Sequence, residues 1–253
     1  RALFILAPAI AFVPSFAVIA TLPFAESLYF ADLNVGLLYY GALSSISTMG
    51  IILGGWASNN KYSLLGGMRS AAQMISYEVP LILSMVGVIM LSGSLNLRVI
   101  VEGQEGWFWN WNIFPQIIAF GVFVVAAISE LNRAPFDLPE AESELVAGYH
   151  VEYSGFRFAF FMLSEYTYMF AVSALTTVLF LGGWHAPAPF LEFIPGIIWF
   201  VLKFACCVFF LFWIRASMPR IRVDQLMGLA WKVLLPIALV NIFLTAFVKM
   251  LLQ

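Results

Sequence analysis

The sequence predicts an all-α fold, a polytopic bundle of transmembrane helices. Of its 253 residues, 62% are hydrophobic and only 10% are charged, whereas a soluble chain carries about 25% charged residues. The apolar residues form runs of about 17 to 25 residues, the length that an α-helix needs to cross a bilayer. Transmembrane β-strands would instead alternate over about ten residues. We therefore expect residues 1–253 to form one domain in the lipid bilayer, which excludes a soluble enzyme and a disordered scaffold.

The first three spans follow from their apolar runs and from the turn signals between them. Prolines interrupt the run Ala2–Ala20 and no small-residue cleavage site follows it, so we expect a span rather than a signal peptide. The second run, Gly36–Ala57, ends at a pair of asparagines, and Met68–Ser92 follows after a short polar stretch. Each run is long enough to cross the hydrocarbon core.

Four further runs predict the remaining spans and bring the expected number to seven. Ile113–Ser129 follows a Trp-rich segment and Phe158–Leu181 ends at a Gly-Gly-Trp turn, both typical of a membrane interface. Gly196–Ile214 ends shortly before a Met-Pro turn, and Leu229–Leu251 is the last apolar run.

The basic residues predict which loops face the cytoplasm. If the spans alternate, three loops lie on one side: 58–67, 130–157 and 215–228. The loops of the opposite side contain a single basic residue, Arg98. The positive-inside rule places these three loops in the cytoplasm. The net charge of −2, without any basic run, gives no basis for binding nucleic acid. The basic residues in or beside the three loops are Lys61, Arg69, Arg133, Arg157, Arg215, Arg220 and Arg222.

Two acids lie deep inside predicted spans. Glu78 is about nine residues beyond Arg69, and Glu165 is about eight residues beyond Arg157, which places both roughly 12 to 13 Å below the interface. An isolated carboxylate is strongly disfavoured at that depth. Two acids at similar depth on different helices favour a proton relay, and the alternative is a protonated acid that bonds to a neighbouring helix.

The loop that begins near Ser129 is rich in acids. Pro135 and Pro139 exclude a regular helix through its middle, although Pro139 could begin a short helix. Carboxylates about 7 Å apart repel by roughly 2.4 kcal/mol at an effective dielectric of about 20. The apolar and aromatic residues between the acids favour a packed loop over a solvated one. After Glu130, the loop has four acids within eight residues and one cation before them, namely Asp137, Glu140, Glu142, Glu144 and Arg133.

The remaining polar residues suggest no cofactor. Lys203 and Lys232 lie inside spans near their ends, and we expect both to reach the interface by snorkelling. The two adjacent cysteines and the two distant histidines lack the spacing of metal ligands, so no metal is expected.

Three segments, in this order along the chain, resemble one known family. They are GGWASNNKYSLLGGMRSAAQMISYEVPL (Gly54–Leu81), ELNRAPFDLPEAESELVAGYHVEYSG (Glu130–Gly155) and RIRVDQLMGLAWKVLLPIALVN (Arg220–Asn241). They resemble the H-subunit family of NADH:quinone oxidoreductase, which belongs to the membrane arm of respiratory complex I. The likeness covers essentially the whole chain. The family normally has eight spans, so the resemblance implies that the first is missing here and that the chain is incomplete at its N-terminus.

The resemblance implies a role in quinone chemistry. A member of this family lines the tunnel that admits quinone from the bilayer and couples quinone reduction to proton translocation through buried acids. Quinone is then the substrate, this chain holds no cofactor and no bond-making catalytic residue, and FMN and iron–sulfur clusters belong to partner subunits. The partners implied are the hydrophilic subunits of the quinone site and small membrane subunits, in the inner membrane of a bacterium.

The resemblance also assigns residues by their position in the motifs. The proton relay would consist of Glu78 and Glu165, with Tyr77 and Arg69 as polar neighbours. The tunnel and the coupling loop would contain Glu130, Arg133, Asp137, Glu140, Glu142, Glu144, Phe156 and Phe160.

Two alternatives remain at this stage. One is the equivalent subunit of a membrane-bound hydrogenase or of a ferredoxin-linked or F420-linked complex, which neighbouring genes would distinguish. The other is a standalone proton or cation transporter, in which the intramembrane acids would be the substrate site. A transporter would function alone after purification, whereas a complex I subunit would purify with iron–sulfur absorption and NADH:quinone activity.

Overall fold

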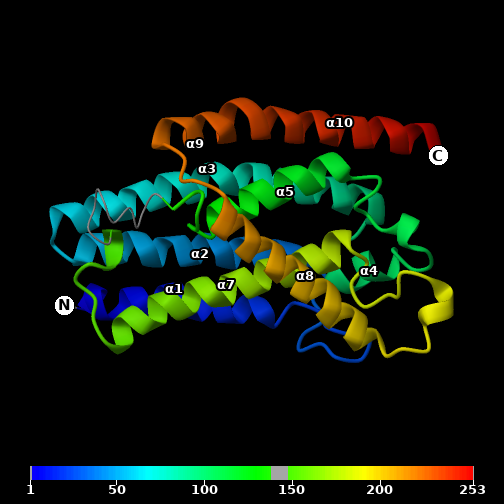
Figure 1. Cartoon of the computed structure of the whole chain (residues 1–253), viewed down its shortest axis with the longest axis horizontal. Coiled ribbons are helices and arrows are strands. Elements are labelled where there is room, and N and C mark those ends of the chain that lie inside the picture. Colours follow the sequence, from blue (N-terminus) through cyan, green and yellow to red (C-terminus); the bar gives the residue numbers. More distant parts are fainter. Residues whose placement is uncertain (1, 138–147, 253) are drawn as a thin grey trace.

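The computed structural model describes residues 2–137 and 148–252, and every regular element in these ranges is helical (Figure 1). The all-α prediction is confirmed. Six segments are long and apolar enough to cross a membrane, with α9 and α10 forming one of them, and α5 is a shorter apolar helix of 14 residues. The main helices are α1 (Ala2–Ile19), α2 (Gly36–Ala57), α3 (Lys61–Ser92), α4 (Leu97–Glu102), α5 (Ile117–Glu130), α7 (Phe156–Phe180), α8 (Gly196–Ser217), α9 (Val223–Leu229) and α10 (Leu235–Leu252).

Two of the predicted loop boundaries are wrong because helices continue beyond the apolar runs. Helix α3 begins at Lys61 rather than Met68, since the side chain of Asn60 accepts a hydrogen bond from the Tyr62 amide and caps the helix there. The loop expected over 58–67 is therefore a short turn. Likewise α8 ends at Ser217 and α9 begins at Val223, so the loop expected over 215–228 shrinks.

The helices pack as one bundle around α3 and α7. Helix α3 contacts α2, α5 and α10, while α7 contacts α1 and α8. At the α1–α2 contact, a Cβ on Gly50 would lie 2.5 Å from the amide nitrogen of Ala11, so only glycine allows this approach. The Ala11 carbonyl accepts hydrogen bonds from Ser47 of α2, at 3.0 Å, and Ser164 of α7, at 2.9 Å. These contacts join three helices at one point.

The connections lie at the two ends of the bundle. Figure 1 shows the turn between α2 and α3, the start of α7 and the start of α9 towards one end, which we call the inner end. Helix α4, the segment before α5 and the loop between α7 and α8 lie at the opposite, outer end. The prediction that three loops face the cytoplasm assumes that successive connections alternate between the two ends in this way.

Lys203 is buried, and the expectation that it reaches the interface is wrong. Its ammonium donates to the carbonyl oxygens of Leu181 at 2.6 Å, Gly183 at 3.1 Å and His185 at 2.7 Å. It also lies 4.0 Å from the centre of the Trp111 ring. The last carbonyls of a helix lack partners within the helix, and here a lysine of α8 satisfies them at the end of α7.

Candidate functional site

A buried ion pair connects the segment after α5 to the middle of α7. Nη2 of Arg133 lies 2.6 Å from Oε2 of Glu165, and the two side chains are only 14% and 10% exposed. The hydroxyl of Tyr149 donates to the other oxygen of Glu165 at 2.6 Å. The guanidinium of Arg133 also lies 5.0 Å from the centre of the Tyr166 ring. One oxygen of Glu165 thus accepts a hydrogen bond and the other lies against a cation, and a carboxylate with so little exposure needs such partners.

Two more acids lie close together on neighbouring helices. Glu130 is the last residue of α5 and is buried, where it contacts Ser44 of α2 and interacts electrostatically with Glu78 of α3. The carboxyl of Glu78 accepts a hydrogen bond from the hydroxyl of Ser45. Sequence reasoning placed Glu130 in a loop, but the fold makes it part of the bundle.

Two buried tyrosines, Tyr40 and Tyr168, interact with these acids. Tyr168 follows Glu165 by one helical turn on α7, and it interacts electrostatically with Tyr40, Glu130 and Glu78. Sequence reasoning missed both tyrosines and the serines of α2. The signal that could have found them is a polar stripe along one face of α2, with polar side chains every four residues. The stripe consists of Tyr40, Ser44 and Thr48.

We call Glu165, Glu130 and Glu78 the acid cluster. These carboxylic acids come from α7, α5 and α3, and Tyr168, one turn beyond Glu165, interacts electrostatically with the other two. Such groups can carry protons as well as charge. Neither the resemblance nor the spacing of the acids indicated that Glu130 lies beside Glu78.

The described part of the coupling loop is packed, as its composition indicates. Phe136 is buried, and its ring lies 6.0 Å from that of Tyr77. The carboxylate of Asp137 accepts a hydrogen bond of 3.1 Å from Arg220, in the segment before α9. The predicted site residues Glu140, Glu142 and Glu144 lie outside the described residues.

The two expected polar neighbours of the relay lie away from Glu78. The hydroxyl of Tyr77 donates to the carbonyl of Leu226 at 2.8 Å and thereby joins α3 to α9. Arg69 is half-buried and lies nine residues before Glu78, which is about 13 Å along the helix. Successive side chains of a helix point in different directions, so adjacency in the sequence does not bring Tyr77 into the acid cluster.

The two phenylalanines predicted for the tunnel wall lie at the start of α7. Phe156 is 85% exposed, and Phe160 is partly exposed with its ring 5.4 Å from Phe12 of α1. They give the inner end of α7 an apolar surface.

A short 3-10 turn, Gly148–His150, brings Tyr149 to the ion pair. The carbonyl of Tyr149 accepts a hydrogen bond from Ser63 at 3.0 Å. A Cβ on Gly66 would lie 2.7 Å from the Cα of Gly148, so this glycine permits the turn to rest on α3. Burial lowers the pKa of His150 to about 4, with Arg133 acting in the same direction and Asp137 against it. Burial also raises the pKa of Tyr153 to about 12.

An apolar cavity of about 430 Å³ lies between α2 and α3. Its lining includes Leu38, Gly41, Ile82 and Met85, and its polar residues are Ser45 and Glu78. One member of the acid cluster therefore borders an apolar space at the side of the bundle.

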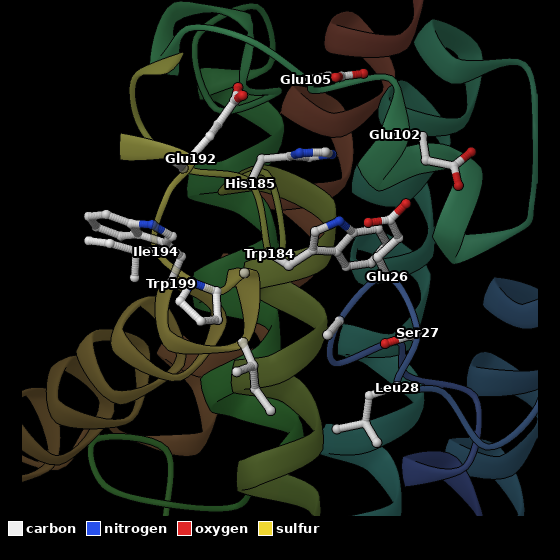
Figure 2. A pocket seen from close by; sticks show the side chains of 15 residues that line it. Glu26, Ser27, Leu28, Glu102, Glu105, Trp184, His185, Glu192, Ile194 and Trp199 are labelled. Atoms are coloured by element: carbon white, nitrogen blue, oxygen red, sulfur yellow. The ribbon is translucent and has the colours of Figure 1, made fainter. Parts of the chain in front are cut away.

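A second cavity, of about 730 Å³, lies at the outer end (Figure 2). Figure 2 shows Trp184 and His185 among four glutamates. Burial lowers the pKa of His185, and the charge of Glu105 opposes this effect. The glutamates come from separate loops and from α4, so only the fold brings them together. They are Glu26, Glu102, Glu105 and Glu192.

The fold and the buried charges define a class, the polytopic helical membrane proteins with ionisable groups inside the bundle. The sequence matches the NADH dehydrogenase family over residues 1–246. It is 66% identical over 248 residues to the H subunit of NADH-quinone oxidoreductase from Brevibacillus brevis, which covers 98% of this chain and 73% of that protein. The H subunit from Anoxybacillus flavithermus is 67% identical over 251 residues, which covers 99% of this chain and 74% of that protein.

The chain belongs to the H-subunit family of NADH-quinone oxidoreductase. The resemblance found in its motifs is confirmed over nearly its whole length. It is a membrane subunit of that enzyme complex, and the other subunits of the complex are its partners.

Proposed function

We propose that this chain lines the quinone tunnel of the complex and couples quinone reduction to proton translocation through the acid cluster. The observation that carries the proposal is the ion pair of Glu165 together with two further acids, Glu130 and Glu78, on neighbouring helices. Arg133 of the coupling loop binds Glu165, and Tyr168, one turn further along α7, interacts electrostatically with Glu130 and Glu78. A change of charge at the loop would therefore act first on Glu165 and then on the two acids behind it.

The chemistry of quinone explains why a loop of acids would respond. Reduction of a quinone to the quinol takes up two electrons and two protons, which changes the charge beside the coupling loop. Arg133 is held between Glu165 and the Tyr166 ring, and it is the group through which such a change would reach α7. The acids of the loop would adjust the electrostatic potential at Arg133; they are Asp137, Glu140, Glu142 and Glu144. A shift of Arg133 would then alter the proton affinity of Glu165.

The tunnel wall and the partners complete the proposal. Phe156 and Phe160 supply the apolar surface that a quinone tail would contact. Electrons would arrive from FMN and iron–sulfur clusters in partner subunits, because this chain is proposed to bind no cofactor itself. The inner end would face the cytoplasm from the inner membrane of a bacterium.

The proposal is tested by replacing Glu165 or Glu78 with Gln in the native complex. Each variant removes the exchangeable charge and keeps the size of the side chain, so we expect normal assembly with quinone reductase activity or proton pumping abolished. Glu105→Gln at the outer end is the matched control and should behave as wild type. Wild-type turnover and pumping in both test variants would show that the acid cluster is not the relay.

A further inference from the structure

The chain reverses direction between α5 and the coupling loop, and this turn carries two members of the proposed machinery. Helix α5 ends at Glu130, and Asn132 adopts the left-handed conformation with a φ of 50°. Arg133 follows at once, and the Phe136 amide donates to its carbonyl at 2.8 Å. Carbonyl groups at a helix end need partners from elsewhere. The contacts that hold this turn in place therefore determine the position of Arg133.

One side chain of α3 bonds to both ends of the turn. Nε2 of Gln73 donates to the carbonyl of Ser129 at 2.7 Å and to the carbonyl of Phe136 at 2.8 Å. Gln73 is 1% exposed, so water does not compete for these bonds. The two carbonyls bracket the segment that contains Glu130 and Arg133.

A second contact from the same face of α3 supports the turn. Nδ2 of Asn132 donates to the hydroxyl of Ser70 at 3.2 Å. Ser70 and Gln73 are three residues apart and therefore lie on one side of the helix. The turn is thus held at both ends and at its middle by α3, which also carries Glu78.

We propose that Gln73 is a positioning residue that keeps Arg133 in register with Glu165. It touches neither quinone nor the acids and acts through the backbone of the turn. Its amide group suits this role because both hydrogens of one nitrogen are donated. A carboxylate has only acceptors, and asparagine is one methylene shorter, so neither could bond to both carbonyls. This inference rests on the proposed function, in which Arg133 controls Glu165.

The chain offers a matched control at its outer end. Gln104 is also 1% exposed, and its Nε2 donates to the carbonyls of Ile100 at 3.1 Å and Val178 at 3.0 Å. Its Oε1 accepts from two backbone amides as well, so its loss disturbs the fold at least as much. It has no contact with the described part of the coupling loop.

The experiment compares Gln73→Met and Gln104→Met in the purified complex. Hydrogen exchange of the 129–137 segment, followed by mass spectrometry, should accelerate about tenfold in Gln73→Met, because the Ser129 and Phe136 carbonyls lose the bonds from Gln73. The Ser129 carbonyl keeps the bond from the Asn132 amide. The same segment should exchange at the wild-type rate in Gln104→Met. Quinone reductase turnover per assembled complex should fall about tenfold in Gln73→Met and remain within about twofold of wild type in Gln104→Met.

A double variant separates positioning from a general loss of stability. Arg133→Lys keeps the charge and weakens the ion pair. If Gln73 acts only through this pair, adding Gln73→Met to Arg133→Lys should reduce turnover by less than about a further twofold. Independent effects would instead multiply. If Gln73→Met does not assemble, Gln73→Asn, which keeps one donor group, serves for the same measurements with smaller effects.

Two results would overturn the positioning role. One is exchange of residues 129–137 at the wild-type rate in the Gln73 variants. The other is a double variant in which the turnover losses of Gln73→Met and Arg133→Lys multiply. Accelerated exchange in Gln73→Met together with normal turnover in Glu165→Gln would have a different meaning. The turn would then depend on Gln73 as inferred, and the proposed relay would be wrong.

Discussion

His150 predicts a specific sensitivity to acid beside the ion pair. Its imidazole is 8% exposed and contacts the edges of the Tyr149 and Phe158 rings, with centroids 4.9 and 5.3 Å away. Within the described part of the chain, its Nδ1 has no hydrogen-bond partner. Burial therefore lowers the pKa of His150 from 6.5 to about 4. The charges of Asp137 and Arg133 act on this pKa in opposite directions, so neither alone sets the value.

The size of the effect follows from the two pKa values. When the segment opens, the pKa of His150 returns to its ordinary value of 6.5, so the open form binds a proton first as the pH falls. The stability of the closed form is complete above about pH 7 and is lost progressively between about pH 6.5 and pH 4. At about pH 5 the open form gains roughly thirtyfold in population, which is about 2 kcal/mol.

Hydrogen exchange of residues 148–155 measures this opening directly. After correction for the intrinsic rate, exchange in the wild-type complex should rise roughly thirtyfold from about pH 7.5 to about pH 5. His150→Phe keeps the aromatic contacts without titrating, and its exchange should change little over the same range. His185→Phe, at the outer end, is the control and should retain the wild-type response. An equal rise in His150→Phe would refute the assignment to this imidazole.

Three further changes have defined outcomes. Lys203→Met should lower the stability of the outer end by about 3 to 5 kcal/mol, because three buried carbonyls lose a charged donor, and the thermal inactivation midpoint of the complex would show it. Gly66→Ala should cost about 1 to 3 kcal/mol because its Cβ meets the backbone of Gly148 at 2.7 Å, and the rate of thermal inactivation should rise accordingly. Tyr149→Phe removes a donor to Glu165, an interaction of about 1.5 to 3 kcal/mol, so quinone turnover per complex should fall at least about tenfold while assembly is retained.

The helices could be predicted from the sequence because membrane insertion depends on the length and polarity of continuous segments. Gly36–Ala57 was expected with the bounds that α2 has. The helix ends were predicted less well, because they depend on caps such as Asn60, which hydropathy does not detect. The packing of the described part of the coupling loop also followed from composition.

The geometry of the site could not be predicted in the same way. The electrostatic interaction between Glu130 and Glu78 depends on how α5 packs against α3, and nothing local in either segment records that packing. Lys203 shows the same limit, because its burial depends on three carbonyls that become available only where α7 ends. Motif positions named Tyr77 as a relay neighbour, but the direction of its side chain depends on the helix, not on the motif.

The ammonium of Lys203 has a consequence for the direction in which protons can travel. It lies at the outer end of the bundle, where carbonyl oxygens and an indole ring enclose it. A fixed cation on a route repels a migrating proton and acts as an electrostatic barrier. In the proposed relay, the ammonium form of Lys203 would therefore oppose a proton path along the bundle axis to the outer end. The proposed path would instead leave sideways at Glu78, which borders the cavity between α2 and α3.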